Sequence, residues 1–452
     1  MSGAVASRTR NLPALPVAHL AEAGLLLAVG LIFVQRTPDL PVVREAVTLS
    51  EVAFGLAAVA WLGMVAVLRP SVRVYSAGLI LPFLFYIFAG LLSLFFSPYD
   101  THDINGLREL LARMYLMTFL LALASYGVSH VSYHRILRAW GVATALVVGL
   151  LALDLIGIRA IDVRDFEDRF IGLFRNPNAA GGALSATLLC FLPVACSRGP
   201  AAGLEQFRTL TRFTLPGLLL GVYLTDSQGA YLAVLAGLTI WPIIRVSRHW
   251  GPAFPILVMV LAVPMIVAVS QVDAVGRFVE QVLGAIGYEA GGRKFSARLD
   301  MIGSRFRAIM QYPWTGVGLS KAPLSHNPLS FVAPHGSHFT ILGITLETGA
   351  LGLAAVGTIF LTYLGIMRSN ARLALDGYPT WRGLNEGLTM AFIGFIVFGL
   401  THDVQTSRAM WLVASLGVCF LPAFESAARQ EQPLPYRPSR MVRVFGHRAA
   451  QP

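Results

Sequence analysis

Residues 313–353 read PWTGVGLSKAPLSHNPLSFVAPHGSHFTILGITLETGALGL, and they join a polar loop to an apolar helix. The loop is interrupted by glycines and carries His326, His335 and His338. From Ser337 onward the sequence stays apolar for long enough to enter a bilayer. His338 therefore opens a predicted membrane helix, at the depth of the lipid headgroups. We interpret the rest of the chain as a hydrophobic scaffold that holds this junction at a membrane surface, next to a group of arginines.

The composition of the whole chain is that of a polytopic membrane protein. Of its 452 residues, 55% are hydrophobic and 13% are charged, whereas ordinary soluble domains have about 25% charged residues. We predict an all-α, polytopic transmembrane helical bundle, with an uncleaved first helix. A membrane span needs about 20 apolar residues, and twelve segments are candidates: 14–34, 48–68, 76–97, 110–128, 137–157, 178–197, 213–225, 228–247, 252–270, 338–366, 384–401 and 407–425. Between the seventh and eighth, Asp226–Gly229 is either a tight turn or a break in one bent segment.

The positive charge is distributed in a pattern that predicts the topology. The net charge is +11, and the arginines gather at the termini and in every second connection. By the positive-inside rule both termini are cytoplasmic, and the long loop 271–337 faces the outside. This placement indicates a membrane protein and not a nucleic-acid-binding one. We divide the chain into four regions: transmembrane helices 1–9 in residues 1–270, the outer loop in 271–337, helices 10–12 in 338–425, and a basic cytoplasmic tail in 426–452.

The outer loop has helical patterns of its own. Apolar residues recur at helical spacing in 272–286 and again in 295–310, which predicts two amphipathic helices. In the second helix, Arg298 and Arg305 are seven residues apart and so lie on nearly the same side. We expect their guanidinium groups to extend along the membrane surface, where they either contact an anionic substrate or are solvated and bound to lipid headgroups.

His338 is the strongest candidate for chemistry. Ser337 before it is a suitable N-cap, and the start of a helix favours the neutral imidazole over the cation. A neutral imidazole can act as a general base toward a hydroxyl group, and the same helix start attracts an anion such as a diphosphate. The alternative is a capping or interfacial histidine without a chemical role.

Other polar and sulfur-containing residues favour structural roles. The three loop histidines and His402 do not follow the spacing of a zinc site, so we predict no metal and no cofactor. Glu347, nine residues after His338, can hydrogen-bond to a neighbouring helix or sit in a wet cavity. Asn176 and Asn178 can cap the following helix or contact a sugar. The cysteines fall in apolar spans and are expected to be packing residues without disulfides: Cys190, Cys196 and Cys419.

Four stretches in order resemble a known superfamily. They are FRNPNAAGG at 174–182, LTDSQGAYLAVLAG at 224–237, SARLDMIGSRFRAIMQYPWTGVGL at 296–319 and HGSHFTILGITLETGALGL at 335–353. Together they resemble the O-antigen ligase and polymerase superfamily across roughly residues 170–365. The single long outer loop before a helix that begins with histidine resembles most the O-antigen ligases of lipopolysaccharide assembly. This resemblance implies a bundle like that of GT-C-type glycosyltransferases in the bacterial inner membrane, with its active site on the periplasmic face.

The resemblance also implies roles for individual residues. His338 corresponds to the family histidine implicated in activating the acceptor, and Arg298 to the arginine implicated in holding the lipid diphosphate. The chain departs from the family at Gln228, where members commonly have arginine in Ser-Arg-Gly. The missing charge must then come from another arginine, with Arg175, Arg169 and Arg305 as the candidates. The remaining substrate-binding candidates are Gln228, His335 and Asn178.

The implied reaction uses two lipid-borne substrates. The donor is an O-antigen glycan on undecaprenyl diphosphate, and the acceptor is a sugar hydroxyl of lipid A-core. His338 takes the hydroxyl proton during attack on the anomeric carbon, which predicts inversion, and arginines stabilise the leaving diphosphate without a metal. The alternatives are an O-antigen polymerase of the same superfamily and a lipid-glycan flippase or other transporter. Membrane lipids are the only other partners expected, and no nucleic acid is.

Overall fold

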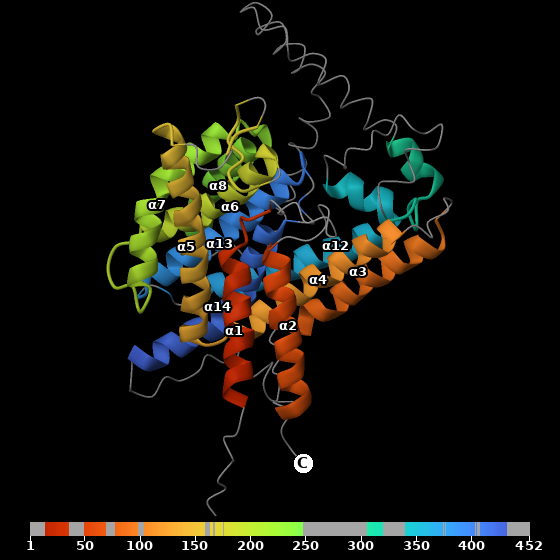
Figure 1. Cartoon of the computed structure of the whole chain (residues 1–452). Helices are drawn as coiled ribbons and strands as arrows, with labels where there is room; N and C mark the ends of the chain where they lie inside the picture. The colour runs from red at the N-terminus through yellow and green to blue at the C-terminus, as the bar shows by residue number, and fades with distance from the viewer. Residues whose placement is uncertain are drawn as a thin grey trace, which may run out of the picture.

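The protein is an all-α membrane protein. The computed structural model describes residues 14–35, 49–68, 77–97, 104–158, 163–165, 168–174, 176–246, 305–319, 340–373, 375, 377–402, 404 and 407–431. Among these residues, α3, α5, α6, α12 and α14 are long and apolar enough to cross a membrane. The named helices (Figure 1) are α1 Ala14–Gly30, α2 Leu49–Leu68, α3 Ala77–Phe95, α4 Ile104–Tyr126, α5 His130–Leu155, α6 Pro177–Ala195, α7 Glu205–Leu224, α8 Gln228–Val246, α12 Thr340–Ala371, α13 Pro379–Phe398 and α14 Arg408–Glu431.

Each of these helices covers most of one predicted hydrophobic segment, with ends that differ by up to eight residues. The predicted segment 252–270 and the predicted loop helix 272–286 lie outside the described residues. The second predicted loop helix, 295–310, is described from residue 305 and is helical through residue 311. Between α7 and α8 the chain makes a turn at Asp226, whose φ is 47°, so these are two helices and not one bent segment.

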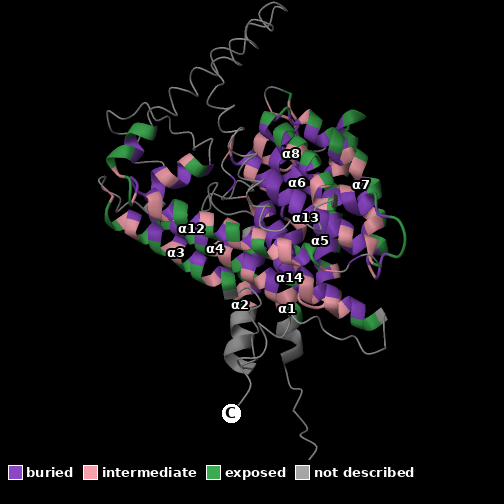
Figure 2. Cartoon of the chain, turned by 180° about the vertical axis from the view of Figure 1, so that it is seen from behind, coloured by how far each residue is buried: buried purple, intermediate pink, exposed green. Residues whose placement is uncertain are grey.

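The buried centre of the molecule is formed by α6 and α13, with α7, α8 and α14 around them (Figure 2). Glycines permit the close approach of the two central helices. A Cβ atom added to Gly383 would lie 2.6 Å from the Pro193 carbonyl oxygen, and Gly387 is in similar contact with the carbonyl of Cys190. Small residues of this kind let helix backbones approach in a membrane, where packing replaces the hydrophobic effect as the driving force.

The helices α3, α4 and α12 extend to one side of this centre (Figure 1), and the described segment 305–319 packs on them. Their apolar side chains are often exposed, for example Leu81 at 74% and Phe95 at 81%. In a membrane, such side chains meet lipid and need no protein cover, whereas the backbone polar groups are satisfied within each helix. We therefore interpret the exposed apolar surface of α3, α4 and α12 as facing lipid.

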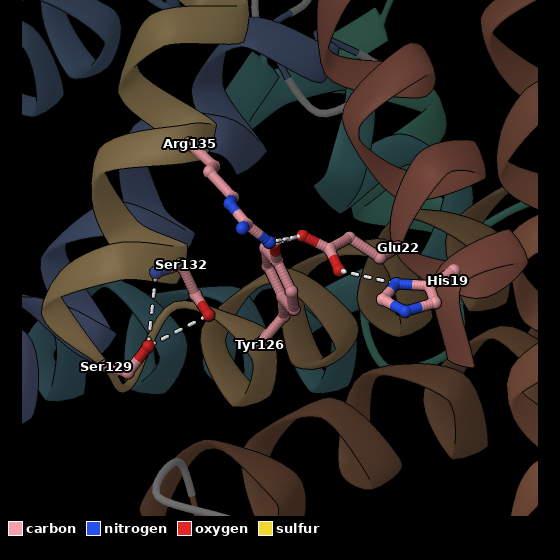
Figure 3. A network of polar contacts seen from close by, with 6 residues as sticks. All are labelled: His19, Glu22, Tyr126, Ser129, Ser132 and Arg135. Atoms are coloured by element: carbon pink, nitrogen blue, oxygen red, sulfur yellow. Dashed lines mark hydrogen bonds and ion pairs between the residues drawn. The ribbon is translucent and has the colours of Figure 1, made fainter. Parts of the chain in front are cut away.

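A polar network joins α1 to the start of α5 (Figure 3). The Tyr126 hydroxyl donates a hydrogen bond of 2.6 Å to Glu22, and Arg135 pairs with the same carboxylate. Ser129 caps α5 by accepting from the Ser132 amide at 3.1 Å. This network lies at the N-terminal end of α5.

The cysteines are free, as expected, but they are not all packing residues. Cys190 and Cys419 are buried inside helices. The expectation is wrong for Cys196, which is exposed. The reason is that α6 ends at Ala195, so Cys196 is the C-cap residue and not part of the packed helix.

Candidate functional site

The start of α12 is fixed to the connection between α13 and α14 through Thr340. Its amide donates to the Gly399 carbonyl at 2.8 Å, and its hydroxyl donates to the His402 carbonyl at 2.8 Å. The same hydroxyl accepts from the Val404 amide at 2.9 Å. Thr340 stands two positions after His338 in the sequence. The described chain that follows segment 320–339 is therefore bonded, at its first residue, to the connection between α13 and α14.

The described chain on the other side of segment 320–339 is attached to the same helix. Within α12, Gly349 has φ 64° and ψ −162°, so the helix is broken there. Segment 313–319 pairs with backbone groups beside this break: the Val317 amide donates to the Leu346 carbonyl at 2.8 Å, and the Ala350 amide donates to the Pro313 carbonyl at 2.8 Å. The backbone groups at these positions therefore have hydrogen-bond partners although the helix is broken.

Glycine is required on both sides of this contact. A Cβ atom on Gly316 would lie 2.6 Å from the Leu346 carbonyl oxygen, and one on Gly349 would lie 2.6 Å from the Thr315 amide nitrogen. Both residues have positive φ, at 70° and 64°. The glycines of the PWTGVG and ETG stretches therefore allow two backbones to meet directly.

A buried group of charges lies beside the break. Arg113 of α4 forms an ion pair with Glu347 of α12, and their side chains are 4% and 7% exposed. The Glu347 carbonyl also accepts a hydrogen bond from the Ser93 hydroxyl. Glu347 therefore bonds to neighbouring helices, which is one of the two roles predicted for it. This ion pair was not visible in the sequence, because its partners are 234 positions apart.

Arg305 belongs to the same group of charges. It is 2% exposed, so the expectation that its guanidinium extends along the membrane surface is wrong. Burial lowers the pKa of this guanidinium, and the negative charge of Glu347 partly offsets that effect. A direct contact between Arg305 and a substrate stays a prediction.

The turn between α7 and α8 lies against the residues that hold Thr340. A Cβ atom on Gly229 would lie 2.6 Å from Nδ1 of His402, and one on Gly181 of α6 would lie 2.8 Å from Cβ of Ser227. The first turns of α6 and α8 therefore touch each other and the end of α13. Gln228, the first residue of α8, is exposed at this place. Two helix N-termini, with their partial positive charge, meet close to the start of α12.

The other described candidates lie on the chain that precedes or opens α6. Arg169 forms two hydrogen bonds with the Asp165 carboxylate, at 3.0 and 2.8 Å. Asn176 is the N-cap of α6 and accepts from the Ala179 amide at 2.8 Å, which confirms the predicted capping role. Asn178 is the second residue of that helix and is partly exposed.

Four predicted site residues lie outside the described residues: His338, Arg298, His335 and Arg175. Within the part of the chain that the structure describes, no three His, Cys, Asp or Glu side chains are grouped to hold a metal ion. Sequence reasoning missed Thr340 altogether, because a threonine in an apolar helix carries no signal of its partners.

Comparison with known proteins finds a similarity to one protein family. No curated protein matches the chain. Residues 213–357 match the model of a protein family described as O-antigen ligase. The matched region contains the turn at Gln228, the segment docked on α12 and the attached start of that helix. This region, about a third of the chain, is therefore similar to the O-antigen ligase family.

Proposed function

We propose that this protein is a membrane glycosyltransferase of the O-antigen ligase type. It transfers an O-antigen glycan from undecaprenyl diphosphate to a sugar hydroxyl of lipid A-core, with inversion at the anomeric carbon. The observation that carries the proposal is the family match over residues 213–357, which includes the segment between the two attachments on α12. A catalytic histidine in a loop gains precision when both ends of that loop are fixed.

In this proposal His338 is the general base. It stands two residues before Thr340, which is bonded to Gly399 and His402. The neutral imidazole accepts the proton of the acceptor hydroxyl while the oxygen attacks the anomeric carbon. The bond from the anomeric carbon to the diphosphate oxygen breaks, and the lipid diphosphate leaves as an anion.

Arg298 is proposed to bind the leaving diphosphate, with Arg175, Arg169 and Arg305 as further sources of positive charge. The first turns of α6 and α8 are in contact, and helix N-termini favour anions. This supports a diphosphate site close to these two helix starts. Gln228 is exposed there and supplies an uncharged amide donor where the family commonly has arginine. His335 and Asn178 are proposed to contact the sugars.

We place the protein in the bacterial inner membrane with twelve spans and the active site on the periplasmic face. The alternation of charged connections supports this topology. All-helical bundles with an outer loop of this kind resemble GT-C-type glycosyltransferases. The proposed reaction needs no metal, because arginines and helix N-termini can stabilise the leaving diphosphate.

The test is transfer by the purified protein from a lipid-diphosphate-linked glycan to lipid A-core, followed by gel shift. Wild type is compared with His338→Ala and with His326→Ala, a control in the same loop, at equal folded yield. We expect His338→Ala to lose at least about 100-fold in rate, the usual contribution of a general base, and His326→Ala to keep most activity. Full activity of His338→Ala would contradict the assigned base.

The same assay separates the alternatives. A reaction that lengthens the lipid-linked glycan and leaves lipid A-core unmodified would identify a polymerase. Movement of the lipid-linked glycan across proteoliposomes without any new glycosidic bond would identify a transporter. Either result would replace the ligase proposal.

A further inference from the structure

One side of α8 is exposed along most of the helix and carries apolar residues. Exposed positions recur in steps of four and three at Tyr231, Leu235, Leu238 and Pro242, a spacing that places them on one face of a helix. The opposite face is buried where α8 packs on α6 and α13. In a membrane, the exposed face meets the acyl chains of lipids. The same spacing reaches Arg245, an exposed cation in the last turn of α8.

Arg245 is held in place by α13 and by its own helix. Its Nε–H group donates to Oε2 of Glu386 at 3.1 Å, and its guanidinium carbon lies 4.8 Å from the centre of the Trp241 ring. The Trp241 indole donates to the same Glu386 oxygen at 2.8 Å, while Arg382 donates to the other oxygen at 3.0 Å. Both carboxylate oxygens are therefore engaged, and the Glu386 side chain is 5% exposed. The buried carboxylate thus orients Arg245 and is itself covered from an anion that approaches from outside.

The terminal amino groups of Arg245 take no part in these contacts. The side chain is 50% exposed, and among the described residues its only hydrogen bond is the one from Nε. Arg208 and Arg212 differ, because each donates from a terminal amino group to a backbone carbonyl near the end of α6. A guanidinium with both terminal amino groups exposed can bind two oxygens of one phosphate in bidentate geometry. Arg245 therefore presents a fixed phosphate-binding group at the end of an apolar face.

We propose that Arg245 binds the phosphate of an anionic phospholipid whose acyl chains lie along the exposed face of α8. The cation and the apolar face are continuous on one helix, and only a ligand with both a phosphate and acyl chains uses both. An anionic lipid is favoured over a zwitterionic one, because the ammonium of a zwitterionic headgroup competes with Arg245 for the phosphate. In the topology proposed above, this end of α8 faces the cytoplasm, where anionic lipids give the membrane surface a negative potential. The inference concerns lipid binding and does not depend on which reaction the protein catalyses.

The test measures lipid binding to the delipidated full-length protein by native mass spectrometry. Phosphatidylglycerol and phosphatidylcholine with the same acyl chains are added to wild type, Arg245→Gln and Arg135→Gln. Arg135 is the matched control, because it is 51% exposed and one of its terminal amino groups is engaged by Glu22. We expect Arg245→Gln to weaken the affinity for the first phosphatidylglycerol about tenfold, as for lost hydrogen bonds to a charged group, and to change that for phosphatidylcholine by about twofold or less. Arg135→Gln should keep both affinities. Equal losses in the two variants, or equal affinity of wild type for the two lipids, would overturn the inference.

A competition experiment separates a lipid site from a site for free phosphate. Inorganic phosphate and a short-chain phosphatidylglycerol are each added to wild type that carries one long-chain phosphatidylglycerol. We expect neither to displace the bound lipid at an equal concentration, because each buried CH₂ group of an acyl chain adds about 0.8 kcal/mol to binding. Displacement by inorganic phosphate would show that the apolar face of α8 contributes nothing, and the lipid site would be refuted.

Thermal unfolding separates lipid binding from a purely structural role of the same residue. Arg245→Gln also removes a bond between α8 and α13, so its unfolding midpoint should fall even without lipid. Phosphatidylglycerol should then raise the midpoint of wild type and Arg135→Gln, and raise that of Arg245→Gln much less. An equal rise in all three proteins would mean that Arg245 only joins the two helices, and the inference would fail.

A second variant keeps the test decisive if Arg245→Gln does not fold. Arg245→Lys keeps the positive charge, but a single ammonium cannot reproduce the bidentate contact. We expect it to bind phosphatidylglycerol more weakly than wild type does in the same mass-spectrometric measurement. Wild-type affinity in Arg245→Lys would refute the bidentate phosphate contact proposed for Arg245.

Discussion

Arg113 and Glu347 form a buried ion pair. We therefore predict that substitutions at the two residues have strongly coupled effects on the free energy of unfolding. Their side chains are 4% and 7% exposed, and they join α4 to α12 beside the helix break. Removing one partner of a buried pair leaves a charge without compensation, at a cost of about 3–5 kcal/mol. We therefore expect Arg113→Met to destabilise the protein by an amount in this range.

The surroundings predict that the two single variants are not equal. Arg113 also lies 3.5 Å from Glu109, which is 26% exposed, and 4.9 Å from the centre of the Tyr86 ring. After Glu347→Gln, Arg113 keeps these contacts, so this variant should cost about 3 kcal/mol, the lower end of the range. The double variant removes both charges and should cost less than the sum of the singles by about 2 kcal/mol, a typical coupling for contacting residues.

The assay is reversible unfolding in mixed detergent micelles with increasing SDS, on the four proteins of a double-mutant cycle. A second cycle on Arg135 and Glu22 is the control, because Arg135 is 51% exposed and such pairs couple by about 1 kcal/mol or less. A coupling energy for Arg113 and Glu347 no larger than that of the control would refute the reasoning.

Two further predictions concern the helix break and the absence of a metal. Gly349→Ala places a Cβ atom on a backbone with φ 64° and against segment 313–319. The backbone strain alone should lower the free energy of unfolding by about 1–3 kcal/mol, measured by thermal unfolding. Gly365→Ala in the same helix has no neighbour within 4 Å and should be neutral or stabilising; equal effects of the two would contradict the role of the break. Transferase activity should survive excess EDTA, because the proposed reaction uses histidine and arginine; loss restored by one divalent ion would contradict it.

The hydrophobic pattern predicted where the described helices lie, because the length of a membrane span follows from the thickness of the bilayer. The cap at Asn176 was also predictable, since it depends on residues three positions apart. The partners of Glu347 and Thr340 were not, because they come from residues distant in sequence. The spacing of Arg305 did not predict its burial, because burial depends on what packs over the side chain.

For the candidate site, the sequence suggests residues that could carry chemistry, and those roles stay predictions; the contacts that hold the described part of the site could not be predicted. The turn at Gln228 and the start of α6 were separate motifs in the sequence, and only the close packing at Gly181 and Gly229 joins them. Contacts through glycine leave no periodic signal, because the residue has no side chain. The attachment of segment 313–319 to α12 is likewise made by backbone groups, which any sequence pattern describes poorly.

The two attachments on α12 lie only a few residues apart, at Thr340 and at Leu346–Glu347. At 1.5 Å per residue they are separated by about 10 Å along the helix. The described chain before segment 320–339 therefore contacts α12 close to Thr340, where the described chain resumes. Both attachments use residues outside segment 320–339, so a change in the length of that segment should leave them in place.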